Sequence, residues 1–546
     1  MPYRGPRASR AEIVLLAALA GWALFPLVLL LAHAAQTHTT FTGADGLIGA
    51  DGVLGADQLQ YLAWARDAAT HGLASDLFTL TPSAHVYLEP LFTITGALSR
   101  LGLSLPLAYL LWKPVGVIAL FLAAVAWARR AFGYQLAART AVVALALFLY
   151  TPLAALFSWV QLGSGRFSFQ LYLLGDELLA AGKLWGYVPS AIAVALVPAA
   201  LLAVERALDP GHAAAVRGLA FGLAPASRGN LWAARTGPLA AAALASLLAS
   251  WLHPWQGITL IVIFAGLAVW RRLRSALVLA VPALGAALPL AYYYVLGHTD
   301  AAWKLASHYE VIPRLPALVL LAGFGPLALI AVAGLSRPRG VVIEQAMLLW
   351  VGACFVTYFA NDAFAPHALQ GLSFPFAVLA VRGWRRLRLP AAIGAVAVAL
   401  VTIPGLAYDA RKFIRVARNP SVEYYLPSAD ERALQWVRSR APAGGVLAPT
   451  PFAIVVPSQT GRPVWVGHGY WSQNYFARAR QADALFRGAL RPARAQRFVL
   501  RTGASLLIAD CAHHATLKRA LGPLVGSVHR FGCAEVYVLA PRSSRR

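Results

Sequence analysis

The sequence predicts a polytopic α-helical membrane protein, with about eleven transmembrane helices and a C-terminal extracytoplasmic α/β domain. Composition, the placement of basic residues and a change of pattern after residue 407 support this. Of the 546 residues, 59% are hydrophobic and 13% are charged, whereas soluble domains are about 45–50% apolar and about 25% charged. This composition excludes one large soluble enzyme and a disordered chain. Three cysteines exclude a disulfide scaffold and a cysteine-based zinc module.

A membrane-spanning helix needs about 20 mostly apolar residues. Segments that meet or approach this length are 13–32, 103–127, 140–160, 187–204, 238–252, 257–270, 276–296, 315–335, 341–359, 368–381 and 390–407. We expect the short segments 238–252, 257–270 and 368–381 to be tilted, interfacial or partly re-entrant. The first apolar stretch exceeds the ~7–15 residues of a signal-peptide core, so we expect it to be retained.

Basic residues are distributed unequally between the two sides of these spans. Up to residue 407, nineteen lie in segments on one side and seven on the other. The positive-inside rule therefore predicts a cytoplasmic N-terminus and an extracytoplasmic C-terminal domain, in the inner (plasma) membrane. The net charge of +25 is explained by these short basic loops, so we expect contact with the lipid bilayer and none with nucleic acid.

The sequence predicts two domains, a transmembrane domain over 1–407 with a large first outer loop (33–102), and an α/β domain over 408–546. In the latter, Ser428 and Glu431 form a capping-box pattern at the start of a helix. Further helices are predicted near 474–487, 492–501 and 515–522, and strands at 446–450, 463–467, 505–510 and 534–540.

Two of the cysteines flank predicted strands of this domain. Cys511 follows one strand and Cys533 immediately precedes the last. In an oxidising exterior they can pair if the two strands are neighbours. Two free buried thiols are the alternative. Cys354 lies inside a span, where a packing role is expected.

The first outer loop holds the most informative stretch, an amphipathic helix over 56–71. Its polar face carries Asp57, Gln60, Tyr61, Trp64, Asp67 and His71 at helical spacing. Carboxylates beside aromatic rings suit a sugar, although a solvated surface helix with interfacial aromatics would show the same pattern. Glu89 and Pro90 open a second short helix.

This region resembles the GT-C superfamily of integral-membrane glycosyltransferases, which includes protein O-mannosyltransferases, oligosaccharyltransferase catalytic subunits and aminoarabinose transferases. The resemblance is strongest over 49–103, where Asp57-x-x-x-Tyr61 follows the first span and the second helix begins near Pro90-Leu91-Phe92. The segments 250–257, 366–384 and 460–468 are also similar to parts of bacterial members.

The resemblance implies transfer of a hexosyl or pentosyl group from a polyprenyl-phosphate-linked donor to an envelope glycan, lipid or protein. Asp57 would be the general base of an inverting displacement, because a hydroxyl is a poor nucleophile until a carboxylate takes its proton. Glu89 is a possible second acid, and Gln60, Tyr61 and Trp64 would bind the acceptor or sugar. The donor-phosphate candidates are Lys183, His253, Lys304, His308 and His367. Each of these also fits an ordinary interfacial or satisfied polar residue.

The sequence departs from the family at Gln58, which stands where members carry a second adjacent acid. We therefore expect no cofactor, and weak or absent metal dependence. A divalent cation (Mg²⁺ or Mn²⁺) is the alternative.

Two other functions fit the topology. A transporter or flippase for a lipid-linked intermediate would carry ionisable residues deep inside its spans or broken helices at the midplane. The predicted spans are nearly free of charge, with Lys113 and Glu344 near their ends. A non-catalytic envelope-assembly protein is the third hypothesis.

Overall fold

The computed structural model describes residues 9–46, 54–160, 165–209, 231–309, 314–335, 341–419, 421–513 and 517–540. The chain divides into two compact units, each built from separate stretches of sequence. Unit 1 comprises Met1–Leu24, Lys113–Tyr294 and Val311–Lys412, and unit 2 comprises Phe25–Trp112, Val295–Glu310 and Phe413–Arg546. The first outer loop thus shares a unit with the C-terminal residues, so an independent domain over 408–546 stays a prediction.

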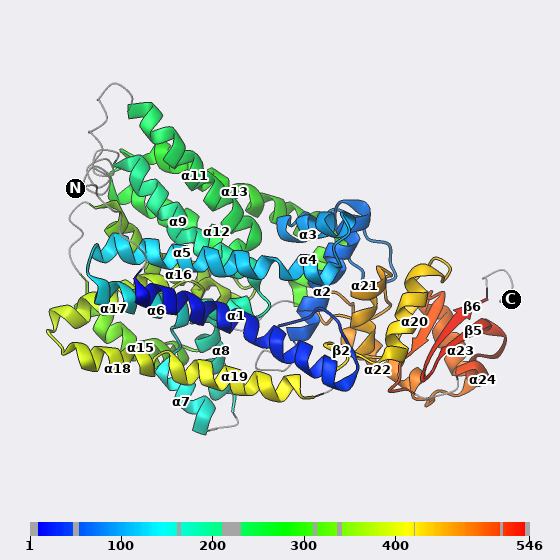
Figure 1. Ribbon diagram of the computed structural model, residues 1–546. Coiled ribbons are helices and arrows are strands. Elements are labelled where there is room, and N and C mark those ends of the chain that lie inside the picture. The colour runs from blue at the N-terminus through cyan, green and yellow to red at the C-terminus, as the bar shows by residue number, and fades with distance from the viewer. Residues whose placement is uncertain are drawn as a thin grey trace. The chain divides into compact units, whose positions relative to one another are not determined.

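Unit 1 is a bundle of apolar helices (Figure 1). Its elements are α1 (Arg10–Thr37, continuing into unit 2), α5 (Trp112–Phe132), α6 (Leu136–Phe148), α7 (Pro152–Val160), α8 (Arg166–Leu178), η1 (Ala180–Leu184), α9 (Val188–Leu208), α11 (Leu231–Leu252), α12 (Pro254–Trp270), α13 (Ala276–Thr299), α15 (Ala317–Ala333), α16 (Val342–Ala360), η3 (Ala365–Leu369), α17 (Ser373–Arg386), α18 (Ala391–Leu400) and α19 (Ile403–Ala417). Helix α9 packs on α11, α12 on α16, and α17 on both α6 and α15.

Among the described residues, six helices are long and apolar enough to cross a membrane, or seven if a bent pair forms one span. The six are Arg10–Thr37, Leu105–Phe132, Val188–Leu208, Ala276–Thr299, Val342–Ala360 and Ala391–Ala417. The predicted span 140–160 is the bent pair, α6 and α7, with a 52° angle between them. The other predicted spans fall on helices α11, α12, α15 and α17. The polytopic helical architecture is therefore confirmed, while the count of eleven stays a prediction.

Unit 2 combines short helices from the first loop with a small α/β assembly. Its elements are α2 (Leu54–His71), α3 (Pro90–Arg100), α4 (Leu105–Leu110), α14 (Ala301–Tyr309), α20 (Ser428–Ser439), η4 (Phe452–Ile454), α21 (Val455–Thr460), α22 (Tyr475–Phe486), α23 (Pro492–Thr502), α24 (Leu517–Leu521) and η5 (Gly522–Leu524). Its strands are β1 (Thr40–Phe41), β2 (Tyr425–Leu426), β3 (Val446–Leu447), β4 (Leu506–Ala509), β5 (Val525–Phe531) and β6 (Ala534–Leu539).

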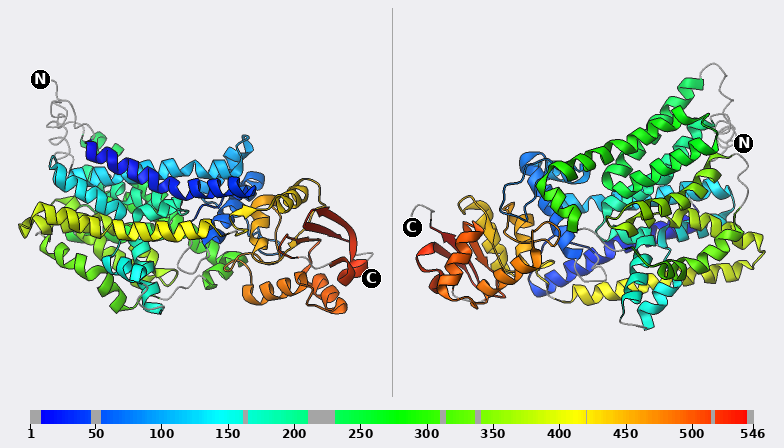
Figure 2. Two further views of the ribbon diagram at one scale, coloured as in Figure 1. Left: turned by 60° about the horizontal axis from the view of Figure 1, so that its bottom comes forward. Right: turned by 180° about the vertical axis from the view of Figure 1, so that it is seen from behind.

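The main sheet of unit 2 has the strand order β3-β4-β6-β5. Its C-terminal strands are the red arrows near the C-terminus in Figure 2. Strand β4 is parallel to β3 and antiparallel to β6, and β5 pairs with β6 as a hairpin. A buried core that includes Phe486, Phe498, Leu507 and Tyr537 joins the sheet to α22 and α23. The predicted strand 463–467 makes only one bridge, between Val464 and Val446. Strand β5 was not predicted, because its inward and outward residues do not alternate.

Two predictions about unit 2 have clear structural outcomes. The capping-box prediction at Ser428 is wrong, because Pro427 is the cap and no side chain caps α20. The carboxylate of Glu431 instead accepts a hydrogen bond from Thr40 Oγ1 at 2.5 Å, beside the β1–β2 pair. Cys511 and Cys533 form a disulfide, and the strands next to them, β4 and β6, are neighbours in the sheet.

Candidate active site on the first outer loop

Asp57 lies in the first turn of α2 and is held by a histidine 411 residues away. His468 Nε2 lies 3.1 Å from Asp57 Oδ1, and the two side chains are 3% and 22% exposed, respectively. The backbone N–H of Tyr470 donates to His468 Nδ1 at 3.2 Å. A nitrogen that accepts carries no proton, so the neutral ring carries its proton on Nε2 and donates it to Asp57. The Asp57 carboxylate is therefore fixed by a hydrogen bond from the imidazole of His468.

The backbone around His468 is fixed by one serine. Ser472 Oγ accepts from the backbone N–H groups of Gly467 and His468, at 3.0 and 3.3 Å, and donates to the carbonyl oxygen of Phe78 at 2.9 Å. Helix α2 is bound to the same C-terminal region through Arg66, whose Nε donates to the carbonyl oxygen of Ser458 at 2.5 Å. Asp57 and His468 thus belong to elements that are tied together independently of their own hydrogen bond.

A second carboxylate lies close to the start of α2. A Cβ atom at Gly55 would lie 3.2 Å from the Glu423 side chain, so glycine permits this approach. Burial and the negative charge of Asp57 raise the pKa of Glu423 above its ordinary value. Ser421 Oγ donates to Glu423 Oε2 at 3.2 Å. Glu423 therefore takes up a proton more readily than an ordinary glutamate does.

The predicted sugar-binding residues of α2 are mostly buried. Gln60 and Trp64 are 5% and 4% exposed, and only Tyr61 is half-buried. Trp64 packs with its ring centroid 4.7 Å from Tyr87 and 5.1 Å from Trp471. Trp303 of α14 completes this aromatic cluster, 4.4 Å from Tyr87 and 4.9 Å from Trp471. Trp64 therefore joins three segments of unit 2, and Tyr61 keeps the most access to a ligand.

Glu89 caps a helix. Its Oε2 accepts from the backbone N–H of Phe92 at 2.8 Å, which satisfies one of the free donors at the start of α3. The side chain is 4% exposed, and Oε1 has no hydrogen-bond partner among the described residues. Burial raises the pKa of Glu89 to about 8. At neutral pH this carboxyl is therefore mostly protonated.

The donor-phosphate candidates separate into two groups. Lys304 and His308 are exposed on α14 in unit 2. Lys183, His253 and His367 lie in unit 1, where they belong to a buried polar cluster. An exposed lysine is accessible to a phosphate, whereas a buried one first has to leave its partners.

In the unit 1 cluster, Lys183 is already paired. Its Nζ lies 3.3 Å from Asp176 Oδ2 and 3.4 Å from Glu177 Oε2, and its side chain is 3% exposed. Glu177 also contacts His367 Nδ1 at 3.0 Å and accepts from Gln370 Nε2 at 2.7 Å. Burial opposes ionisation of Glu177, but Lys183 and His367 outweigh it and hold its pKa well below the ordinary value.

His253 lies beside this cluster with its ring centroid 5.3 Å from that of His367. It is 5% exposed, and its Nδ1 has no hydrogen-bond partner among the described residues. Burial, helped by the neighbouring His367, lowers the pKa of His253 well below its ordinary value. His253 is therefore neutral at physiological pH and offers a dipole to an anion, not a charge.

Comparisons with known proteins give a structural likeness. No family model matches the sequence, and no curated protein sequence does. The apo oligosaccharyltransferase of Archaeoglobus fulgidus matches with a TM-score of 0.50 and 13% identity, over 97% of this chain and 74% of that one. ArnT from Cupriavidus metallidurans, bound to undecaprenyl phosphate, has a TM-score of 0.48 and 14% identity, over 97% of this chain and 98% of that one.

The chain has the GT-C fold. The family resemblance seen in the first outer loop is thus confirmed at the level of the fold. This fold brings a C-terminal segment beside the first-loop aspartate within unit 2, which explains why Asp57 and His468 meet.

The residues beside Asp57 do not fit a metal centre of the kind that uses two adjacent acids. Gln58 is 1% exposed, and its Oε1 accepts from the backbone N–H of Asp45 at 3.4 Å. Among the residues that the structure describes, the one group of three or more possible metal ligands is Asp67, His71 and His85, which does not include Asp57.

Two residues of the site were not predicted from the sequence, namely His468 and Glu423. His468 ends the stretch 460–468 that carries part of the family resemblance, so a signal was present. No pattern in the sequence connects Glu423 with Asp57, because their proximity depends on the tertiary fold of unit 2.

Proposed function

We propose that this protein is a membrane glycosyltransferase that moves a sugar from a polyprenyl-phosphate donor to an extracytoplasmic hydroxyl acceptor on a glycan, glycolipid or protein. The observation that carries the proposal is the fixed pair of Asp57 and His468 at the start of α2. The GT-C fold supports it, since the Archaeoglobus fulgidus protein of similar fold is an oligosaccharyltransferase.

In this reaction Asp57 removes the proton of the acceptor hydroxyl. The hydroxyl oxygen then forms a bond to the anomeric carbon of the sugar, and the bond from that carbon to the phosphate oxygen breaks with inversion. The phosphate leaves with the electron pair. A positioned carboxylate contributes about 10²–10⁴-fold to such a step. His468 is a positioning residue, because its Nε2–H fixes one oxygen of the base.

The leaving phosphate needs positive charge nearby, because negative charge accumulates on it as the bond breaks. Within the unit that holds Asp57, Lys304 and His308 on α14 are exposed and suit this role. Lys183 is neutralised by two carboxylates, so we assign it, with Glu177 and His367, to holding the end of α8 and η1 in place.

The proposal also sets the orientation of the chain in the membrane. The cytoplasmic N-terminus and the extracytoplasmic C-terminal residues follow from the excess of basic residues on one side of the spans. Asp57 and His468 then lie outside, on the side where a lipid-linked sugar is consumed in this reaction.

The first test compares Asp57→Asn with wild type in cells that lack the protein. Asparagine keeps the shape but cannot take a proton, so we expect transfer to fall at least ~10²-fold. The measurement is the profile of envelope glycans and glycolipids, followed by transfer rates in membrane vesicles.

A matched control is Asp362→Asn, which removes a 78%-exposed carboxylate paired with Arg314. This variant should restore the missing sugar as wild type does. Near-wild-type transfer by Asp57→Asn would place the base elsewhere. Deletion cells with unchanged glycans and glycolipids would argue against the transferase itself.

A further inference from the structure

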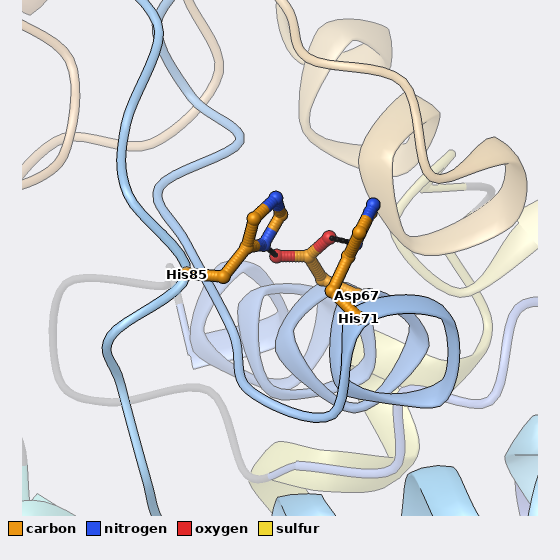
Figure 3. A group of neighbouring side chains, drawn as sticks. All are labelled: Asp67, His71 and His85. Atoms are coloured by element: carbon orange, nitrogen blue, oxygen red, sulfur yellow. Dashed lines mark hydrogen bonds and ion pairs between the residues drawn. The ribbon is translucent and has the colours of Figure 1, made fainter.

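Three side chains in the first outer loop converge at a place distinct from Asp57 (Figure 3). Asp67 and His71 are one turn apart on α2, and His85 comes from the loop that follows it. His71 Nδ1 lies 2.8 Å from Asp67 Oδ1, and His85 Nδ1 lies 3.0 Å from Asp67 Oδ2. The two imidazole rings stack with centroids 3.8 Å apart.

We propose that Asp67, His71 and His85 form a zinc site that fixes the loop between α2 and α3. The three ligand atoms lie within 4.8 Å of one another. Zinc binds imidazole nitrogen and carboxylate oxygen at about 2.0–2.2 Å, which places tetrahedral ligands about 3.3 Å apart. The two aspartate–histidine distances, one to each carboxylate oxygen, are close to that separation. One of these oxygens and the two ring nitrogens would bind the ion.

The carboxylate already has the support that metal-binding aspartates need. Asp67 is 4% exposed, and its Oδ2 accepts from both the backbone N–H and the Oγ of Ser75, at 2.7 and 2.8 Å. These two bonds fix the carboxylate, whose Oδ1 faces His71 and whose Oδ2 also faces His85. Such hydrogen bonds to a ligand orient it and raise metal affinity.

The two histidines are accessible to a metal ion in solution. Their side chains are 46% and 37% exposed, for His71 and His85 respectively, so an ion reaches them from solvent. Without metal, each ring donates its Nδ1 proton to Asp67. With metal, each neutral ring carries that proton on Nε2, toward solvent, and the Nδ1 lone pair binds the ion. Two imidazoles and one carboxylate suit zinc better than magnesium or calcium, which prefer oxygen ligands only.

The site is separate from the proposed catalytic base. Asp67 follows Asp57 by ten residues, which corresponds to about 15 Å along α2. One ion cannot contact both carboxylates. The proposal therefore concerns the structure of the loop, and it stands or fails independently of the proposed transferase activity.

The loop that the metal would fix carries part of the aromatic cluster. Backbone hydrogen bonds of 3.0 Å in both directions join Ala74 and Tyr87, which closes the loop just beside His85. Tyr87 packs on Trp64 and Trp303. A metal bridge from α2 to His85 therefore holds Tyr87 in place as well as the two histidines.

The test measures zinc binding by the full-length protein, purified in detergent through a tag without histidines. After chelator treatment and dialysis, wild type should bind one equivalent of Zn²⁺ in competition with a chromophoric chelator. His71→Ala and His85→Ala should each weaken binding at least ~100-fold, and Ser75→Ala about 10-fold, as expected for a residue that only orients a ligand. The matched control His529→Ala, which alters a histidine that stacks on Trp436, should bind as wild type does.

Two further readouts make the assignment specific. Zinc should raise the unfolding temperature of wild type and have no such effect on the His71→Ala/His85→Ala double variant. Cobalt in place of zinc should give the visible absorption of a tetrahedral site, absent in the double variant. Equal zinc affinity in wild type and double variant would overturn the proposal, as would no binding by folded wild type.

Discussion

At the scale of single residues, the site depends on whether a side chain is protonated and on which atom carries the proton. His468 is useful to Asp57 because the backbone N–H of Tyr470 occupies Nδ1, which leaves the proton on Nε2. Glu89 shows the opposite case, since burial keeps its proton in place. The proton that a polar side chain carries in this site therefore depends on its burial and on the donor beside it.

Replacing His468 should reduce catalysis and spare binding. We expect His468→Ala to lower kcat about 10–100-fold with little change in KM, because a misplaced base acts only on the transition state. His468→Gln keeps an N–H donor near Asp57 and should recover part of the loss. Equal activity of the Ala and Gln variants would indicate that the hydrogen bond has no positioning role.

Glu89 predicts a pH dependence of stability. Its pKa is about 8 in the folded protein, against about 4.3 in an unfolded chain. The contribution of this proton to stability is complete below the pKa of the unfolded state. It is lost as pH rises through the pKa of the folded state. Wild type should therefore lose a few kcal/mol between pH 5 and pH 8, relative to Glu89→Gln.

The measurement is thermal unfolding of both proteins in detergent at several pH values. Glutamine keeps an oxygen that accepts from the N–H of Phe92, so the cap survives. Parallel stability curves would contradict the assigned protonation. If the Glu89→Gln variant kept its stability but lost all transfer activity, Glu89 would instead be a catalytic acid.

At the scale of elements, α2 organises unit 2. Its first turn carries Asp57, its middle carries Trp64, and its last turns carry Asp67 and His71. In unit 1, the ion pairs of Lys183 with Asp176 and Glu177 link the short, fully buried η1 to the end of α8. Both elements are therefore fixed by polar contacts as well as by apolar burial.

Removing Lys183 should destabilise the protein. Lys183→Met leaves the buried carboxylate of Glu177 without its cation, which costs about 3–5 kcal/mol. The double variant Lys183→Met/Glu177→Gln should recover part of that loss, since the uncompensated charge is gone. Lys304→Met, on the exposed surface of α14, should keep stability and raise KM for the donor. A stable Lys183→Met protein with a raised donor KM would return Lys183 to the phosphate-binding role.

At the scale of the whole molecule, the two units combine segments that are far apart in sequence. The first loop and the C-terminal residues share one unit, which places Asp57 and His468 together. Deleting the C-terminal residues would therefore remove a part of the proposed active site.

The proposed orientation can be measured with single added cysteines. Arg274→Cys and Arg501→Cys place exposed thiols on opposite proposed sides, and a membrane-impermeant maleimide should label only the second in intact cells. The natural cysteines provide a silent background, because Cys354 is buried and the other two form a disulfide. Labelling of Arg274→Cys alone would reverse the topology.

The sequence by itself determined the helical membrane class, the amphipathic helix with Asp57, and most elements of the α/β part. These features depend on local composition and on periods of two or 3.6 residues, which can be read along the chain. It did not reveal strand β5 or the burial of Trp64, because both depend on what packs against them.

Only the tertiary structure decided which polar residues meet. Asp57 contacts His468 across 411 residues of sequence, and Asp67 contacts His85 across 18. No local pattern encodes such contacts. The ion pair of Lys183 with Glu177 is likewise set by the fold. A hydrogen bond requires two atoms within about 3.5 Å, and the fold alone sets that distance. The sequence therefore supplied the chemical groups, and their partners came from the packing of segments distant along the chain.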